Sequence, residues 1–299
     1  MIRFSKYITV YILLSSAVLL PGIFSLVRWG LKPAIDFAGG TLIELKLPQN
    51  IGERDIKQVA ARNDLTLSSL QITSQGTVLL RTKTTIPKTV NAFVTDLITP
   101  ATNSAEIIRQ ETVGPVLGKE LLFKAIVAAF IAVVGILLYV AYAFSNFRFG
   151  MAAIIALGHD LLVVSGAFSL LGHFWGVEVD TLFVTAVLTT MSFSVHDTIV
   201  VFDRIREHLK KDNRAPLTDV VDRALTETMG RSLANSFTII LMLLALVLMG
   251  GETVKWFAVA LLIGTISGTY SSPFVAAPVL ILWNRLKLKK KIKTPIKQI

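Results

Sequence analysis

The sequence predicts a polytopic α-helical membrane protein with six transmembrane helices and one small extracytoplasmic α+β head domain. Of its 299 residues, 53% are hydrophobic and 17% are charged, whereas roughly a quarter of a soluble domain is charged. Six stretches are long and apolar enough to cross a hydrocarbon core of about 30 Å as helices. One long hydrophilic stretch, residues 28–120, shows strand and helix periodicities instead.

The apolar stretches set the domain boundaries. The six expected spans are residues 8–27, 121–144, 149–171, 181–202, 233–250 and 256–283. Residues 1–27 are therefore expected to form the first transmembrane helix, residues 28–120 the head domain, and residues 121–283 the other five helices with a loop at 203–232. The first span is too long for a signal peptide and lacks a small-x-small cleavage site, so we expect it to be retained.

Positive charge predicts the orientation of the spans. Segments 1–7, 145–148, 203–232 and 284–299 hold 17 Lys and Arg residues, and the short loops 172–180 and 251–255 hold one. The positive-inside rule then places both termini in the cytoplasm and the head domain outside. The basic tail 284–299 is expected to contact anionic lipid rather than nucleic acid, with a cytoplasmic partner or a ribosome as the alternative.

Within the head domain the order of elements predicts a ferredoxin-like βαββαβ motif. Strands are expected at 41–47, 67–73, 77–83 and 104–113, and helices at 53–62 and from Pro87 onward. Gln75 and Gly76 suggest a hairpin turn. The head contains no His and no legible nucleophile–base pair, so a binding or lever role is favoured over an enzymatic one. The chain contains no Cys, and we expect neither a metal nor another cofactor.

Ionisable residues inside the spans are the main functional candidates, because each costs roughly 2.5–3.5 kcal/mol at the middle of a bilayer. The third span carries His159 and Asp160, the fourth carries His196 and Asp197, and Arg231 precedes the fifth. By helical rise, Asp197 lies about 8 Å from the inner surface and Asp160 about 16 Å. Interhelical hydrogen bonds are the plainer interpretation of the two histidines. Asp160 is open between a functional and a structural role.

A carboxyl group and a guanidinium at similar depth can form a proton switch. Removal of a carboxyl from water favours its neutral form, whereas a guanidinium about 4 Å away favours the charged form by about 4 kcal/mol at an effective dielectric of 20. Movement of Arg231 relative to Asp197 would therefore release or admit a proton. We expect Asp197, Arg231, His196 and Asp160 to form a proton relay. An intramembrane aspartyl hydrolase is disfavoured, since Asp160 and Asp197 differ in depth and have no Gly-x-Gly-Asp setting.

Other features of the last span and the head entry have a structural interpretation. Gly264 and Gly268 form a small-xxx-small pattern typical of helix packing. Pro273 and Pro278 are expected to bend the helix that contains them. Gly39 and Gly40 are expected either to form a turn that leads into a strand or to act as a hinge between membrane and head.

Three motifs give the chain a family resemblance that covers nearly its whole length. Residues 36–41 (DFAGGT) resemble an Asp-Phe-x-Gly-Gly motif, with Asp36, Phe37, Gly39 and Gly40 in the motif positions. Residues 113–120 (VGPVLGKE) resemble the lead into the second span. The most specific match is residues 194–207, SVHDTIVVFDRIRE. Together these motifs resemble the SecF proteins of the SecD/SecF family, in the resistance–nodulation–division superfamily.

The resemblance implies a function that the composition does not. It implies pairing with a SecD-like six-span partner beside the Sec translocon channel, and proton flow that moves the head and helps secreted preprotein chains to leave the channel. It assigns the essential intramembrane carboxylate to Asp197 and its arginine to Arg231. Many members carry Asn where this chain has His196, so His196 either joins the relay or keeps a hydrogen-bonding role. The alternative is a proton-coupled small-solute transporter subunit of the same superfamily.

Overall fold

The structure, a computed structural model, describes residues 3–47, 51–72, 76–83, 87–97, 106–143, 147–212 and 214–292. The chain divides into two compact units. One is helical and contains Met1–Lys32 and Ala128–Ile299, and the other is the smaller α+β unit Pro33–Val127. The second unit overlaps most of residues 28–120, and it is called the head unit below.

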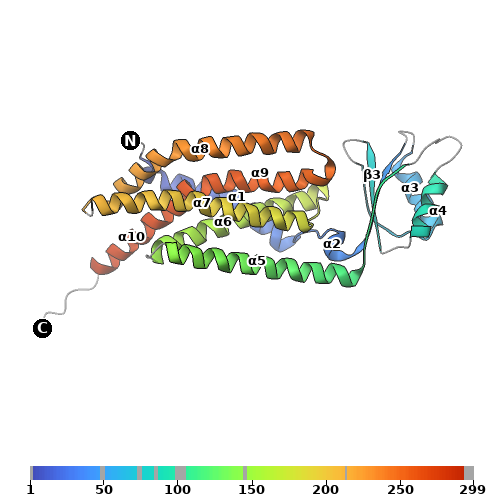
Figure 1. Ribbon diagram of the computed structural model, residues 1–299, viewed down its shortest axis with the longest axis horizontal. Helices are drawn as coiled ribbons and strands as arrows, with labels where there is room; N and C mark the ends of the chain where they lie inside the picture. Colours follow the sequence, from blue (N-terminus) through green and yellow to red (C-terminus); the bar gives the residue numbers. More distant parts are fainter. Residues whose placement is uncertain are drawn as a thin grey trace. The chain divides into compact units, whose positions relative to one another are not determined.

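The described residues contain six helical segments that are long and apolar enough to cross a membrane. The helices of this part of the chain are η1 (Phe4–Tyr7), α1 (Ile8–Arg28), α5 (Pro115–Ala143), α6 (Phe147–Trp175), α7 (Thr181–Lys211), α8 (Leu217–Met249), α9 (Glu252–Ser271), the π turn η2 (Ser272–Ala276) and α10 (Ala277–Ile292) (Figure 1). Helix α9 packs against α6, α7 and α8, and α1 packs against α6. The six predicted spans are thus confirmed as helices.

Helices α7 and α8 continue beyond the apolar stretches that predicted them. Most of the predicted loop 203–232 is helical, because α7 continues to Lys211 and α8 begins at Leu217. Arg204 Nε donates to Glu227 Oε2 at 2.5 Å, and Lys211 Nζ donates to Glu207 Oε1 at 2.8 Å. A hydropathy pattern predicts a span only as far as the apolar residues reach. The helices themselves continue into polar sequence, where side-chain ion pairs such as these stabilise them.

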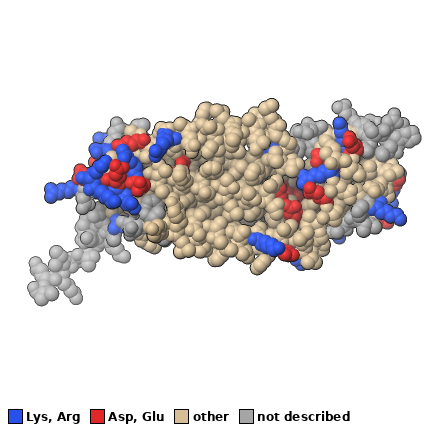
Figure 2. Space-filling view, viewed as in Figure 1, with Lys and Arg blue, Asp and Glu red and all other residues tan. Residues whose placement is uncertain are grey.

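Charged residues in the helical unit are concentrated at one end. Figure 2 shows Lys, Arg, Asp and Glu gathered around the α7–α8 connection and almost none over the middle of the visible face. An unpaired charge is costly in hydrocarbon, so this distribution is typical of a membrane-spanning bundle.

The last span is interrupted where the sequence predicts a bend. Five residues, Ser272–Ala276, form a π turn between α9 and α10, and Pro273 lies in its first turn. Proline cannot donate the backbone hydrogen bond of a regular helix, which accounts for the irregular turn. The turn brings Ser272 within 2.9 Å of the Thr198 hydroxyl on α7.

Glycines allow two pairs of helices to approach closely. A Cβ added at Gly264 would lie 2.3 Å from Cγ2 of Thr190, and one at Gly268 would lie 3.2 Å from Cα of Ser194. The predicted packing role of Gly264 and Gly268 therefore agrees with the α7–α9 contact. Gly22 and Gly166 make a similar contact between α1 and α6, which the sequence analysis did not identify.

The head unit has the predicted βαββαβ order. Its elements are β1 (Gly40–Lys46), α3 (Glu53–Arg62), β2 (Leu67–Ile72), β3 (Thr77–Thr82), α4 (Pro87–Leu97) and β4 (Glu106–Val113), preceded by the single turn α2 (Ile35–Ala38). The sheet is antiparallel with strand order β2-β3-β1-β4. Ile43, Leu80 and Phe93 are fully buried in its core. Gln75 and the predicted strand ends at 73 and 104–105 lie outside the described residues.

Candidate functional site: the polar interior of the helical unit

Asp197 lies on the part of α7 that faces α8 and α9. Its side chain is half-buried, and its Oδ2 accepts a hydrogen bond of 2.8 Å from the Ser232 hydroxyl on α8. Asp197 lines a small pocket with Asn235 and Ser236 of α8 and Thr269 of α9. A carboxyl group in such a pocket has polar neighbours on three helices although it sits in a membrane-spanning segment.

Arg231 immediately precedes the serine that binds Asp197. It is exposed and forms no ion pair among the described residues. It lines a groove between α7 and α8 together with Asp203 and Glu227. The structure therefore brings the α8 turn that bears Arg231 to Asp197, with Ser232 rather than Arg231 as the hydrogen-bond donor.

His196 lines the Asp197 pocket from the neighbouring position on α7, and its side chain is exposed in this chain. Thr185 and Ser192, which lie on the same face of α7 as His196, are exposed as well. Polar groups in a membrane span rarely face lipid. This face of α7 thus has the character of a surface that water or another protein covers.

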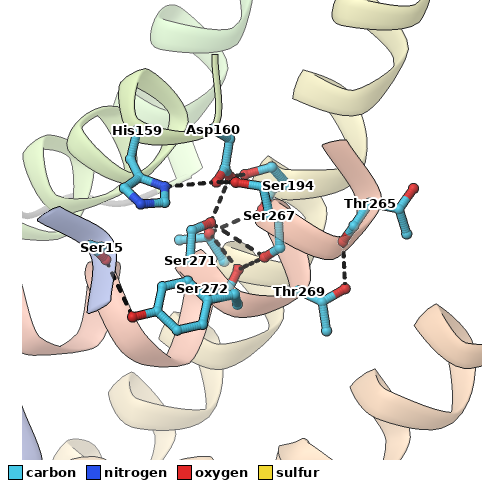
Figure 3. Close-up of polar contacts among 12 residues, drawn as sticks. Ser15, His159, Asp160, Ser194, Thr265, Ser267, Thr269, Ser271 and Ser272 are labelled. Carbon is cyan, nitrogen blue, oxygen red and sulfur yellow. Dashed lines mark hydrogen bonds and ion pairs between the residues drawn. The ribbon is translucent and has the colours of Figure 1, made fainter. Parts of the chain in front are cut away.

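Asp160 is the centre of a second, more deeply buried cluster (Figure 3). It is 4% exposed. Its Oδ1 accepts from Ser267 at 2.5 Å and from Nδ1 of His159 at 3.0 Å. Its Oδ2 accepts from Ser194 at 2.5 Å and from Ser271 at 2.6 Å. Three helices, α6, α7 and α9, thereby supply the ligands of one carboxylate.

The two acidic positions are connected through α7. Ser194 donates to Asp160 and also lines the Asp197 pocket. Asp160 and Asp197 themselves do not share a hydrogen bond among the described contacts. Ser194 therefore binds Asp160 and also borders the pocket of Asp197. The difference in predicted depth did not reveal this connection.

The serine ligands were mostly missed by sequence reasoning. Ser232, Ser267 and Ser271 are ordinary helix residues by composition, and Ser194 entered the sequence analysis only as the first residue of the motif 194–207. The four-residue spacing of Ser267 and Ser271 places both on one face of α9. That spacing signals a polar face, but it does not identify the carboxylate the face serves.

The residues of the Asp36 motif lie in the head unit. Asp36 and Phe37 belong to the single turn α2, and Phe37 is buried. Gly39 has φ of 75° and Gly40 has φ of 137°. A Cβ on Gly39 would lie 2.9 Å from Cα of Pro115, and one on Gly40 would lie 2.7 Å from the Thr82 carbonyl oxygen. The positive φ angles and the close contacts with neighbouring backbone atoms both explain why glycine occupies these two positions.

Comparison with known proteins agrees with these motifs. The family model for the C-terminal region of the protein-export membrane proteins SecD/SecF matches residues 93–286. The protein translocase subunit SecF of Thermobaculum terrenum is 39% identical over 298 residues, which is 95% of this chain and 94% of the relative. The corresponding subunit of Synechocystis is 35% identical over 298 residues and 93% of each chain.

A solved structure has the same fold. The crystal structure of SecDF, a translocon-associated membrane protein from Thermus thermophilus, matches with a TM-score of 0.85 and 29% sequence identity over 95% of this chain. A second structure, SecDF in its super-membrane-facing form, matches with a TM-score of 0.68 and 30% identity over 97% of the chain. This chain spans 39% of the SecDF chain in both cases. It therefore belongs to the SecD/SecF family of protein-export membrane proteins.

Proposed function

We propose that the chain is an accessory subunit of the bacterial Sec protein-export machinery, in which proton transfer through the helical unit moves the head domain and aids late translocation of secreted chains. Relatives named as translocase subunits, similar over more than nine-tenths of the chain, support the export role. The half-buried Asp197 in a polar pocket of a membrane-spanning helix supports the coupling and is the observation that carries it.

In the proposed relay, Asp197 holds the transferred proton and Arg231 controls its release. Ser232 keeps the carboxylate oriented toward α8. A shift of α8 by a fraction of a turn would exchange the Ser232 contact for one with the adjacent Arg231, and a guanidinium favours the charged carboxylate. His196 either passes protons to the pocket or contributes hydrogen bonds. Asp160 forms the inner part of the relay.

The proposed assembly pairs this helical unit with a SecD-like six-span partner next to the Sec translocon channel. The exposed polar face of α7, which includes Thr185, Ser192 and His196, supports a protein partner in the membrane because lipid does not solvate such groups. Motion of the head would be passed on through the segment that contains Asp36, Phe37, Gly39 and Gly40. The head would act as a binding or lever domain rather than as an enzyme.

The proposed topology follows the charge distribution of the sequence. Both termini and the α7–α8 connection lie in the cytoplasm, and the head lies outside the inner membrane. The alternative, a proton-coupled small-solute transporter, draws no support from the relatives, which are named as translocase subunits.

The proposal is tested by Asp197→Asn, which keeps the size and the Ser232 contact but cannot exchange a proton. The matched control is Asp203→Asn on the same helix, where the carboxylate is exposed and pairs with Arg206 at 3.7 Å. The protein and its SecD-like partner would be assayed in membrane vesicles for export of a secreted chain, with and without a proton gradient. We expect Asp197→Asn to lose the gradient-dependent part of export and Asp203→Asn to keep it.

Full gradient-dependent export by Asp197→Asn at normal protein levels would refute the proton-coupled function. Equal loss in both variants would show a general effect of removing acidic residues from α7 and would refute the specific role of Asp197.

A further inference from the structure

Strand β2 is one edge of the sheet in the head unit. The strand order β2-β3-β1-β4 gives it a partner, β3, on one side, and the described residues supply no strand on the other side. An edge strand directs alternate N–H and C=O groups away from the sheet. The pairing with β3 passes over Ser68 in a bulge and is regular from Ser69 to Ile72. This edge is therefore a template on which a further strand can pair.

The two edges of the sheet differ in the features that prevent such pairing. Proteins protect exposed edges with charged side chains, prolines and bulges. Strand β4 carries Glu106, Arg109 and Glu111 along its length, and a register shift near its middle leaves Ile108 as an extra residue. Strand β2 has the sequence LSSLQI, with no charged residue and no proline, and its bulge lies near its beginning. The β2 edge is thus much less protected than the β4 edge.

Apolar surface lies beside the β2 edge, on the face of the sheet that α3 and α4 cover (Figure 1). Ile72 pairs with the buried Val78 and points to the same face, yet it is 63% exposed. At the other end of β2, a cavity of about 430 Å³ lies between α3 and the start of the strand, and its lining includes Leu67 and the buried Ala60 and Leu65. Apolar side chains of an added strand would cover Ile72 and enter this cavity.

We propose that the β2 edge binds an extended segment of an unfolded polypeptide, which adds a strand to the sheet of the head unit. Main-chain hydrogen bonds supply the contact, and the cavity and Ile72 favour apolar side chains at alternate positions of the segment. From Leu67 to Ile72 the strand covers about 17 Å, at about 3.4 Å for each residue. The bound segment is therefore about as long as β2 itself, which has 6 residues.

This inference deepens the function proposed above, and it rests on that function for the source of the segment, a secreted chain that passes the head. Main-chain pairing depends little on side-chain identity, so one edge can bind chains of different sequence. A single pair of short strands is only marginally stable in water, so the segment also leaves readily. Both properties suit a site that holds a moving chain briefly.

The first test is hydrogen exchange of the full chain in lipid nanodiscs with a synthetic peptide. In the peptide, Thr and Val alternate over the length of β2, and lysines at both ends keep it soluble. A control peptide has the same side chains and an N-methylated backbone, so it cannot donate main-chain hydrogen bonds. We expect the first peptide to slow exchange in β2 and not in β4, and the control to slow neither.

Three results of this experiment would overturn the proposal. Unchanged exchange in β2 at the highest soluble peptide concentration would show that the edge does not bind an extended chain. Equal slowing by both peptides would show binding through side chains without strand addition. Equal slowing in β2 and β4 would show that the protection of β4 does not matter.

A pair of substitutions tests whether the peptide occupies this edge. Ile72→Lys places a charge on the β2 edge, as proteins do where they prevent pairing, and Ile108→Lys is the matched change on β4. Both side chains are exposed, at 63% and 49%, so we expect neither substitution to change the thermal unfolding of the protein. Ile72→Lys should weaken the slowing of exchange in β2, and Ile108→Lys should not. Full slowing in Ile72→Lys would overturn the proposal.

Site-directed cross-linking tests the source of the segment, since the chain contains no cysteine of its own. Ser68→Cys and Ile108→Cys place a thiol on the exposed bulge residue of each edge strand. The protein and its SecD-like partner would carry a photoreactive probe on this thiol, in vesicles with a secreted chain arrested during export. We expect Ser68→Cys to link to the secreted chain much more than Ile108→Cys does. Equal linking, or linking of Ser68→Cys to the SecD-like partner alone, would overturn the proposal.

Peptide binding to β2 does not depend on a proton gradient. If Asp197→Asn keeps full gradient-dependent export while the peptide protects β2, the proposed proton coupling fails and the strand-binding edge stands. If the peptide does not protect β2 while Asp197→Asn loses gradient-dependent export, the strand-binding edge fails and the proposed function stands.

Discussion

Alanine substitutions at three glycines of the head unit distinguish the cost of a left-handed backbone from the cost of close packing. Gly39 and Gly118 lie next to each other, and Gly76 precedes β3. Gly39, after α2, has φ of 75° and faces Pro115, the first residue of α5. Gly118 on α5 packs in turn against the backbone of Phe37 and Gly39, with ordinary helical φ. Gly76 has φ of 76° and nothing within 4 Å of the Cβ position. Each would be replaced by alanine.

The expected losses of stability follow from these geometries. Gly76→Ala pays only for the left-handed backbone, about 1–2 kcal/mol. Gly118→Ala brings a Cβ to 3.0 Å from the Gly39 nitrogen, at about 1–3 kcal/mol, from which the better helix propensity of alanine recovers about 1 kcal/mol. Gly39→Ala combines the left-handed backbone with a contact of 2.9 Å to the Pro115 Cα, so the expected loss of stability is about 2–5 kcal/mol.

The assay is native-state hydrogen exchange of the full chain in nanodiscs, read at the amides of α2 and β1 and at those of α3 as an internal reference. We expect the protection of α2 and β1 to fall most in Gly39→Ala, less in Gly118→Ala, and in Gly76→Ala to change only around β3. Equal effects of Gly39→Ala and Gly76→Ala on α2 would refute the reasoning, because the contact with Pro115 would then add nothing.

Two further predictions concern the helical unit. Gly264→Ala places a Cβ 2.3 Å from the Thr190 side chain of α7 and should lower the temperature of thermal unfolding. The control Gly135→Ala on α5 meets nothing within 4 Å and should leave that temperature unchanged or raise it slightly. Equal effects of the two substitutions would contradict the close α7–α9 contact. Asp222→Ala, at a site 2% exposed, leaves the Ser5 amide and hydroxyl without their acceptor. Loss of this pair should cost about 1–3 kcal/mol and increase proteolysis near the N-terminus. The exposed Asp219→Ala should cost less than about 1 kcal/mol, and equal proteolysis of both would contradict the role of the Ser5 contact.

Much of the fold was readable from the sequence, because periodicity and hydropathy are local properties. The six spans and the βαββαβ order of the head follow from residue patterns that repeat within one element, as in the strand around Ile43 and the helix Glu53–Arg62. Helix ends were less accurate: α7 extends to Lys211 because polar side chains, including Glu207 and Lys211, stabilise it where hydropathy no longer does.

The acidic residues of the candidate site were also readable, since a carboxylate in an apolar span stands out by its cost. Asp160 and Asp197 were both singled out on that ground. Their partners were not, because a serine in a helix carries no information on what it faces. Ser232 and Ser267 became ligands only when α8 and α9 packed against the helices that bear the acids.

The sequence alone determined a membrane protein with six spans, a separate α+β head and two costly carboxylates within the spans, since each of these follows from the chemistry of consecutive residues. Tertiary structure decided which carboxylate is saturated with hydrogen bonds and which lies in a pocket open to neighbouring helices. It also decided that Ser232, and not Arg231, contacts Asp197 in this conformation. Hydrogen bonding depends on the relative rotation and separation of packed helices, and those are set by contacts such as Gly264 with Thr190, between residues far apart in the chain.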